Sequence, residues 1–194
     1  MATEPKTFLT PEQYLEIERK AEYKSEYYAG EMFAMAGAQE PHNLITTNVI
    51  VSLGLQVRGR ACRVYGSDMR VKVSQSGLYT YPDVSAVYGE RQLEDTGLDT
   101  LLNATLIVEV LSPTTEVRDR GRKFRDYRTI ASLRQYVMIA SELVEVELYT
   151  RDDKGDWVLT LASQPEDVVQ LASIDCSLRL TDVCDKTDLL PSAI

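Results

Sequence analysis

The sequence lacks the segments that would place it in a membrane or outside the cell. No apolar stretch approaches the roughly 20 residues that a membrane-spanning helix needs. The N-terminal segment MATEPKTFLT has neither the basic region nor the apolar region of a signal peptide. We therefore expect a cytoplasmic protein that has no membrane partner.

Cysteines and several recurrent motifs are also scarce. Cys62, Cys176 and Cys184 are an odd number without metal-ligand spacing, which predicts reduced thiols in the core or on the surface. There are no internal repeats, low-complexity linkers or phosphate-binding glycine motifs. These absences exclude a disulfide scaffold, a repeat protein and a glycine-rich nucleotide-binding loop.

The length and composition fit one globular domain. The chain has 194 residues, of which 44% are hydrophobic and 26% charged, enough for a sizeable core. We expect an N-terminal helix and hairpin over residues 8–37, a core over 42–161 and a C-terminal tail over 162–194.

Positive charge is in deficit. The net charge of −9 opposes an extended grip on nucleic acid, because phosphate contacts rest on clustered Lys and Arg. One local exception is a basic run, composed of Arg118, Arg120, Arg122, Lys123, Arg125 and Arg128. The alternative is a solvated face on which these cations pair with acids at helical spacing, namely Glu116, Asp119 and Asp126.

The most informative residue that is present is Glu109. It lies within the β-branched run 106–111, and a continuous apolar run bounded by Ser112-Pro113 predicts a strand buried on both faces. An ionised acid is rare in such a strand unless it is paired or binds a metal. The alternative is a residue at the strand end, exposed just beyond the core.

A second carboxylate, Asp83, has a similar setting. Residues 79–88 alternate like a strand, and Pro82 confines Asp83 to a strand start or edge. The separation of 109 − 83 = 26 residues leaves room for a loop over 89–103 and a return strand. Two converging carboxylates are the oxygen ligands that Mg²⁺ takes.

The helix expected after Pro113 supplies a cation. At about 100° per residue, Lys123 falls inside the apolar arc together with Phe124 and Tyr127. Arg120 is the rival inward cation. A lysine aimed at Glu109 would orient the attacking hydroxide or stabilise charge on the phosphate. The alternative is a stem that buries its methylenes and keeps its amine in water.

Two further residues are candidates of lower rank. His42, the single histidine, precedes an apolar helix over 43–58 and lies either near a catalytic cleft or in a capping or packing role. Residues 62–73 predict two strand pieces joined by a turn or bulge. Asp68 in that turn either forms it or lines the site, because its strand should neighbour that of Asp83.

The remaining elements are expected to be structural. Thr10, Pro11 and Gln13 predict the capped start of a helix that runs to about Lys24. A hairpin turn is expected over 29–31. Three later strands suit an antiparallel extension of the sheet with one wet face, at 134–139, 145–149 and 157–161.

The order of the motifs resembles a known family. Along the chain come AMAG, His42-Asn43, a hydrophobic helix, SDMRV, YPDV, IVEVLSP and a helix with Asp119, Lys123 and Tyr127. This order is similar to the Uma family of restriction endonucleases, a branch of the PD-(D/E)XK nuclease superfamily, from about Phe8 to Trp157. Leu111 stands where lysine is common in the superfamily, and the branch is thought to use a lysine on the helix instead.

The resemblance implies a fold and a chemistry. The fold would be α/β (α+β), a restriction-endonuclease-like central mixed sheet flanked by helices. The activity would be hydrolysis of DNA phosphodiester bonds with Mg²⁺ or Mn²⁺, in a homodimer. Metal ligands would be Asp83, Glu109, the Val110 carbonyl and Glu26. Asp83, Glu109, Lys123 and His42 would be catalytic, with Asp68 and Tyr127 nearby.

Two other classes of function compete with this one. The nuclease fold could serve as a non-catalytic binding or assembly module, which the acidic composition and Leu111 both allow. It could also carry a metal-dependent hydrolase of small phosphoesters. Salt-sensitive DNA affinity separates the endonuclease from the small-substrate hydrolase.

Overall fold

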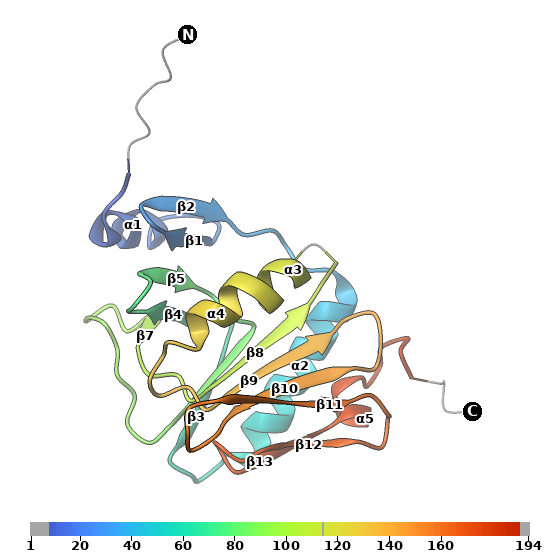
Figure 1. The fold of residues 1–194 in the computed structure, drawn as a ribbon. Helices are drawn as coiled ribbons and strands as arrows, with labels where there is room; N and C mark the ends of the chain where they lie inside the picture. Colours follow the sequence, from blue (N-terminus) through green and yellow to red (C-terminus); the bar gives the residue numbers. More distant parts are fainter. Residues whose placement is uncertain (1–7, 114, 191–194) are drawn as a thin grey trace.

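The largest element of the fold is a mixed six-stranded sheet (Figure 1). The computed structural model describes residues 8–113 and 115–190. In spatial order the strands are β11 (Trp157–Ala162), β10 (Val146–Arg151), β9 (Gln135–Ala140), β8 (Leu106–Leu111), β6 (Val84–Tyr88) and β3 (Cys62–Gly66). β8 and β9 run parallel, and the other neighbours run antiparallel. The expected central mixed sheet is confirmed.

A smaller sheet packs above it with the first helix, α1 (Pro11–Glu18). Its strands, in spatial order, are β2 (Glu31–Ala34), β1 (Ser25–Tyr28), β5 (Leu78–Thr80), β4 (Arg70–Val73) and β7 (Thr100–Leu101). Tyr14, Tyr27 and Tyr79 are buried together where α1 covers this sheet. The small sheet therefore brings the N-terminal hairpin close to the helix that follows β8 (Figure 1).

Helices lie on both faces of the large sheet (Figure 1). One face carries α2 (Glu40–Gln56). The other carries a single helical stretch in three parts: α3 (Glu116–Arg118), a π-helical turn η1 (Asp119–Lys123) and α4 (Phe124–Tyr127). The chain ends with a two-stranded sheet and a short helix that pack near α2: β12 (Val168–Leu171), β13 (Cys176–Arg179) and α5 (Leu180–Val183).

The alternation of side chains along β8 divides the core in two. Every residue of β8 is buried, as the continuous apolar run predicts. Leu106, Val108 and Val110 join the cluster under α2, whereas Ile107 and Leu111 join the cluster under α4. Because strand residues two apart share a face, Glu109 points to the side of α3, η1 and α4.

Several local predictions are confirmed and others need correction at their ends. Thr10 and Gln13 form the predicted capping box, and the Ala29-Gly30 turn joins β1 to β2. α1 ends at Glu18 rather than near Lys24, because the chain turns back to place β1 beside β5 and Lys24 bonds the Ser67 carbonyl at 2.9 Å. α2 extends from residue 40 to residue 56, so it includes His42 instead of starting after it.

The expected strand over residues 79–88 is wrong as a single element. The chain leaves the small sheet after Thr80 and enters the large sheet at Val84. Pro82 lies in the crossing, where its missing N–H costs no ladder bond. Asp83 therefore sits at the junction of the two sheets, one residue before β6.

The segment expected as a C-terminal tail has structure of its own in residues 168–183. Leu171, Leu178 and Leu180 are fully buried in the cluster under α2.

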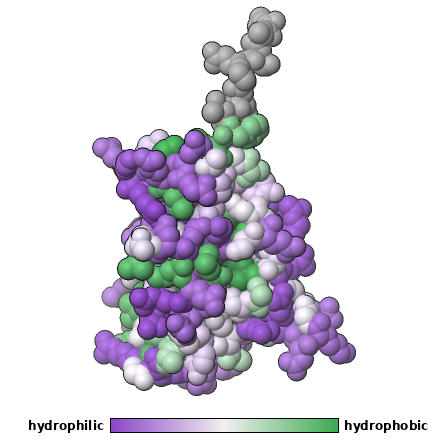
Figure 2. Space-filling model, turned by 90° about the vertical axis from the view of Figure 1, so that its left-hand side faces the viewer, coloured by the Kyte–Doolittle hydropathy of each residue, from purple (hydrophilic) through white to green (hydrophobic). Residues whose placement is uncertain are grey.

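The three cysteines are buried and form no disulfide, which confirms the prediction of reduced thiols. Within the described residues, no helix is long and apolar enough to cross a membrane. On the side turned toward the viewer in Figure 2, hydrophilic residues dominate and a hydrophobic band crosses the middle.

The hairpin turn gives a test of this packing. Gly30 and Gly155 have almost the same φ, +89° and +90°, but a Cβ at Gly30 would lie 2.7 Å from Cδ1 of Phe8 whereas one at Gly155 meets no atom within 4 Å. Gly155→Ala should lose about 1–2 kcal/mol of unfolding free energy from backbone strain alone. Gly30→Ala should lose more than this in equilibrium urea unfolding. Equal losses would show that Phe8 moves aside without cost.

Candidate active site

Asp83 lies where two strands of the large sheet stop pairing. The β6–β8 register ends at Val84 opposite Val108, so Glu109 and Val110 extend beyond β6. Because β6 does not reach Val110, Oδ2 of Asp83 accepts the Val110 N–H at 2.7 Å where a backbone carbonyl of β6 would otherwise do so. Because the N–H and C=O of one strand residue point to the same edge, the Val110 carbonyl is directed toward this junction as well.

His42 completes this corner of the site. Its Nε2 lies 3.2 Å from Oδ2 of Asp83. It belongs to the first turn of α2, where Pro41 at the helix start leaves no backbone donor to satisfy. Burial alone lowers the pKa of His42, but the hydrogen bond and charge of Asp83 outweigh burial and raise that pKa above its usual value. The pair favours an imidazolium bound to a carboxylate.

Glu109 is held on the opposite face of β8 by the helix. Its side chain is buried, and Oε1 accepts hydrogen bonds from Nζ of Lys123 at 3.0 Å and from the Tyr127 hydroxyl at 2.8 Å. Lys123 and Tyr127 are four residues apart, so one helix face presents both donors. The arrangement fixes the rotamer of Glu109 from two directions.

Lys123 contacts two further acids. Its Nζ lies 3.2 Å from Oδ1 of Asp119 and 3.5 Å from Oε1 of Glu26, and both acids are almost fully buried. The π-helical turn spans Asp119 to Lys123 and aligns both side chains toward the sheet. Glu26 arrives from β1, which links the small sheet to the site.

Two neighbours hold Glu26. The hydroxyl of Thr80 donates to Oε1 of Glu26, and the guanidinium of Arg118 pairs with its other oxygen. Sequence reasoning missed the contacts of Thr80 and Arg118 with Glu26. The pairing of Asp119 with Lys123 follows the i, i+4 spacing noted in the sequence, but the pair is buried and does not lie on a solvated face. No local signal marks Thr80, because its role depends on β1 pairing with β5.

The acids outnumber the cations in this buried space, and the pKa values reflect it. Burial raises the pKa of Glu109, Lys123 opposes that rise, and the charges of Asp119 and Asp83 add to it, so the pKa reaches about 8. Burial alone lowers the pKa of Lys123, but Glu109 and Asp119 hold it well above its usual value. The lysine is therefore held in its charged form, and ionisation of Glu109 is opposed by its burial and by the neighbouring acids.

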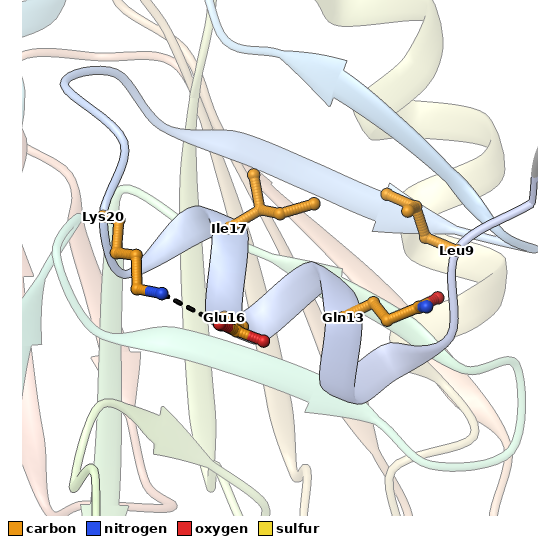
Figure 3. Close-up of a pocket in the computed structure, with 5 residues that line it drawn as sticks. All are labelled: Leu9, Gln13, Glu16, Ile17 and Lys20. Atoms are coloured by element: carbon orange, nitrogen blue, oxygen red, sulfur yellow. Dashed lines mark hydrogen bonds and ion pairs between the residues drawn. The ribbon is translucent and has the colours of Figure 1, made fainter.

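A hollow elsewhere on the surface has no such chemistry. Figure 3 shows a pocket of about 280 Å³ along α1, lined by Leu9, Gln13, Glu16, Ile17 and Lys20. Glu16 and Lys20 form an exposed i, i+4 ion pair at 2.8 Å across it. None of the buried acids lines this pocket.

The comparison with known families decides the relationship. The Uma2 family model, whose description is "Putative restriction endonuclease", matches residues 11–181. The chain belongs to the Uma2 family. Two proteins of Synechocystis sp. are similar to this Uma2 chain over most of their length: "Uncharacterized protein slr1290" is 37% identical over 87% of both chains, and "Uncharacterized protein sll1609" is 37% identical over 78% of this chain and 86% of its own.

The fold is shared with a solved structure. It superposes with a TM-score of 0.74 and 18% identity on a protein of Anabaena variabilis, described as "a putative nuclease belonging to DUF820", and the match covers 91% of this chain and 97% of that one. This confirms the nuclease-like fold of the Uma2 chain.

Some residues singled out from the sequence lie away from the Uma2 site. Asp68 is 93% exposed and pairs with Lys24 at 2.5 Å, because β4 joins the small sheet rather than the sheet of β6 and β8. Arg120 points toward β10 and away from Glu109, and it binds Glu116 at 2.7 Å and also Glu147. Of the two rival cations, Lys123 is the one that faces Glu109.

The oxygen atoms near Asp83 are of the chemical type that binds a hard cation. Asp83, Glu109 and the Val110 carbonyl offer oxygen only, and Mg²⁺ takes one or two carboxylates and fills its remaining positions with water and substrate phosphate. Oε1 of Glu109 is already occupied by Lys123 and Tyr127. Among residues 8–113 and 115–190, no three His, Cys, Asp or Glu side chains group as a metal site. Such a cation would thus rest on two carboxylates.

The raised pKa of Glu109 predicts how stability varies with pH. An acid whose pKa is about 8 when folded and 4.5 when unfolded binds more protons in the folded state, so its contribution to stability is present below pH 4.5 and is lost as the pH rises toward 8. Glu109→Gln keeps both hydrogen-bond acceptor contacts and removes this titration. In EDTA, the urea-derived unfolding free energy of the variant relative to wild type should therefore increase from pH 5 to pH 8. A constant difference across that range would contradict the prediction.

Proposed function

We propose that this Uma2 chain is a metal-dependent endonuclease that hydrolyses phosphodiester bonds of DNA. The observation that carries the proposal is the buried Lys123–Glu109 pair beside Asp83, at the point where β6 and β8 part. Membership of a family whose description is "Putative restriction endonuclease" supports the same reaction class. A homodimer in the cytoplasm is part of the proposal, since two related sites are the simplest way to cut two strands.

The proposed ligands are Asp83, Glu109, the Val110 carbonyl and Glu26, which lies 3.5 Å from Nζ of Lys123. When bound, Mg²⁺ or Mn²⁺ would lower the pKa of a water and polarise the phosphate. His42 holds Asp83 from the side of α2, and Tyr127 holds Glu109 from the helix. The two carboxylates thus keep their orientation, so they would lose little conformational entropy when the metal ion binds.

Lys123 is the proposed catalytic cation. Its charge is maintained by Glu109 and Asp119, so it remains a donor at neutral pH. A buried ammonium directed at the reacting phosphate stabilises the charge that develops there, or orients the attacking water through a hydrogen bond. Asp119 restrains Lys123 from its own helix, and Glu26 does so from the small sheet.

One observation favours the rival function, a non-catalytic module with the same fold. The hydrogen bonds of Lys123 and Tyr127 to Glu109 satisfy that carboxylate without a metal, as a purely structural network would. In that case Asp83 and Glu109 bind no divalent cation. Metal affinity is therefore the property that separates the two functions.

Divalent-cation binding should depend on the two carboxylates of the junction. We expect Asp83→Ala and Glu109→Ala to weaken Mg²⁺ or Mn²⁺ binding at least tenfold in calorimetry and to abolish cleavage of plasmid DNA. Asp68→Ala is the matched control, since it removes an exposed carboxylate outside the site. A folded wild type that binds neither cation would favour the non-catalytic module.

Cleavage should depend on Lys123 more than on Arg120. Lys123→Met should reduce the cleavage rate by about 10²–10³-fold, the usual cost of losing one charge-stabilising donor, while the cation still binds. Arg120→Met removes an equal charge from the same helix, where the side chain is partly buried and does not contact Glu109, and should change the rate by less than tenfold. Thermal melts would verify folding, and equal effects of the two substitutions would remove the catalytic role from Lys123.

A further inference from the structure

A pocket of about 230 Å³ opens beside Lys123, between the helix and the N-terminal hairpin. It is lined by Tyr28, Phe33, Leu78, Arg118, Arg122, Lys123 and Asp126. Pockets for drug-sized ligands hold about 300–1,000 Å³. A volume below that range suits a single ring system, and the lining combines aromatic rings, cations and one carboxylate.

Among the cations of this pocket, Arg122 is the one for which the described residues form no ion pair. Its guanidinium carbon lies 3.7 Å from the centroid of the Tyr28 ring, so the two groups are stacked. Arg118 and Lys123 are paired with Glu26, and Lys123 also with Glu109. Within the described residues Arg122 has no carboxylate partner, which leaves its donors free for an anion.

One carboxylate oxygen of Asp126 has no hydrogen-bond donor among the described residues. Its side chain lines the pocket, the residue is 7% exposed, and Oδ2 has no hydrogen-bond partner in the described part of the chain. Buried carboxylate oxygens almost always have a partner. A ligand that brings an N–H donor into the pocket would supply the missing one.

We propose that this pocket holds one unstacked nucleobase with an exocyclic amino group, adjacent to the phosphate that faces Lys123. The inference rests on the proposed function for its substrate, a DNA strand. A base stacks on the Arg122–Tyr28 pair, as bases do on aromatic rings and guanidinium planes. Its amino group donates to Asp126, in the way that carboxylates accept from cytosine N4. Free donors of Arg122 contact the neighbouring phosphate.

This pocket selects among bases and among strand forms. Thymine places a carbonyl where cytosine has its amino group, so Asp126 repels it. A base inside a duplex offers only its edge, whereas the pocket takes a whole ring. The substrate is therefore single-stranded or has a base turned out of the helix beside the cleaved bond.

The test is binding of labelled octamers of deoxycytidine and of thymidine, followed by fluorescence anisotropy in EDTA so that no cleavage occurs. Wild type should bind the cytidine octamer at least fivefold more tightly. Asp126→Asn, which can turn its amide to either base, should bind both equally. Arg122→Ala should weaken both at least fivefold and reduce the salt dependence. Arg179→Ala removes an exposed arginine of β13 and should change either affinity less than twofold.

Each other outcome overturns the inference. Absence of binding by wild type, equal binding of the two octamers, or an unchanged preference in Asp126→Asn would each reject the nucleobase site. If Asp126→Asn does not fold, Phe33→Ala serves instead, because Phe33 is 39% exposed and should weaken both octamers at least threefold. Cleavage is measured separately with Mg²⁺: base preference without cleavage retains the pocket and rejects the endonuclease, and cleavage without preference does the reverse.

Discussion

The charged Lys123 ammonium is the group on which the rest of the site depends. Glu26, Glu109 and Asp119 are all buried within 3.5 Å of it and come from β1, β8 and the helix. A buried carboxylate without a cation loses its hydration and gains nothing in return. One lysine thus makes it possible for three elements, distant in the sequence, to meet with acidic side chains at a single point. It also ties the small sheet to the large one.

The helix that carries the lysine is irregular. Asp119 and Lys123 lie four residues apart within the π-helical turn, and both side chains are buried at the site. On the other side of the site, the strand pairing is interrupted at Pro82. Because the chain leaves the small sheet before it enters the large one, Asp83 is free to accept the Val110 N–H in place of a strand. Both departures from regular structure therefore lie at the site.

The sequence predicts the parts that follow from short-range patterns. The run 106–111, the capping box at Thr10 and the hairpin turn at Gly30 depend on neighbours in the chain, and all three are as expected. The split of residues 79–88 between two sheets could not be read from alternation, because both halves alternate in the same way. The sequence places Asp68 near the site only if its strand neighbours that of Asp83, whereas β4 pairs with β5 and β7. The periodicity of apolar residues in a sequence does not show which strands pair or which sheets contact each other.

A protein with negative net charge that binds DNA needs its cations at the surface that contacts the phosphates. The net charge of −9 includes acids such as Glu109 and Asp119, which are paired with Lys123 in the interior. Within the basic run, Arg120 pairs with Glu116 and Lys123 pairs with Asp119 at the i, i+4 spacing that the sequence predicts. Arg120 also pairs with Glu147, and Arg118 pairs with Glu26, and these contacts between elements do not follow from helical spacing. Arg122 departs from that pattern, since it is held by an aromatic ring instead of an acid. An overall deficit of positive charge therefore lowers the non-specific affinity for phosphate. It still leaves one cation, Arg122, at the pocket beside Lys123. Recognition of DNA by this chain would then depend on local fit more than on total charge.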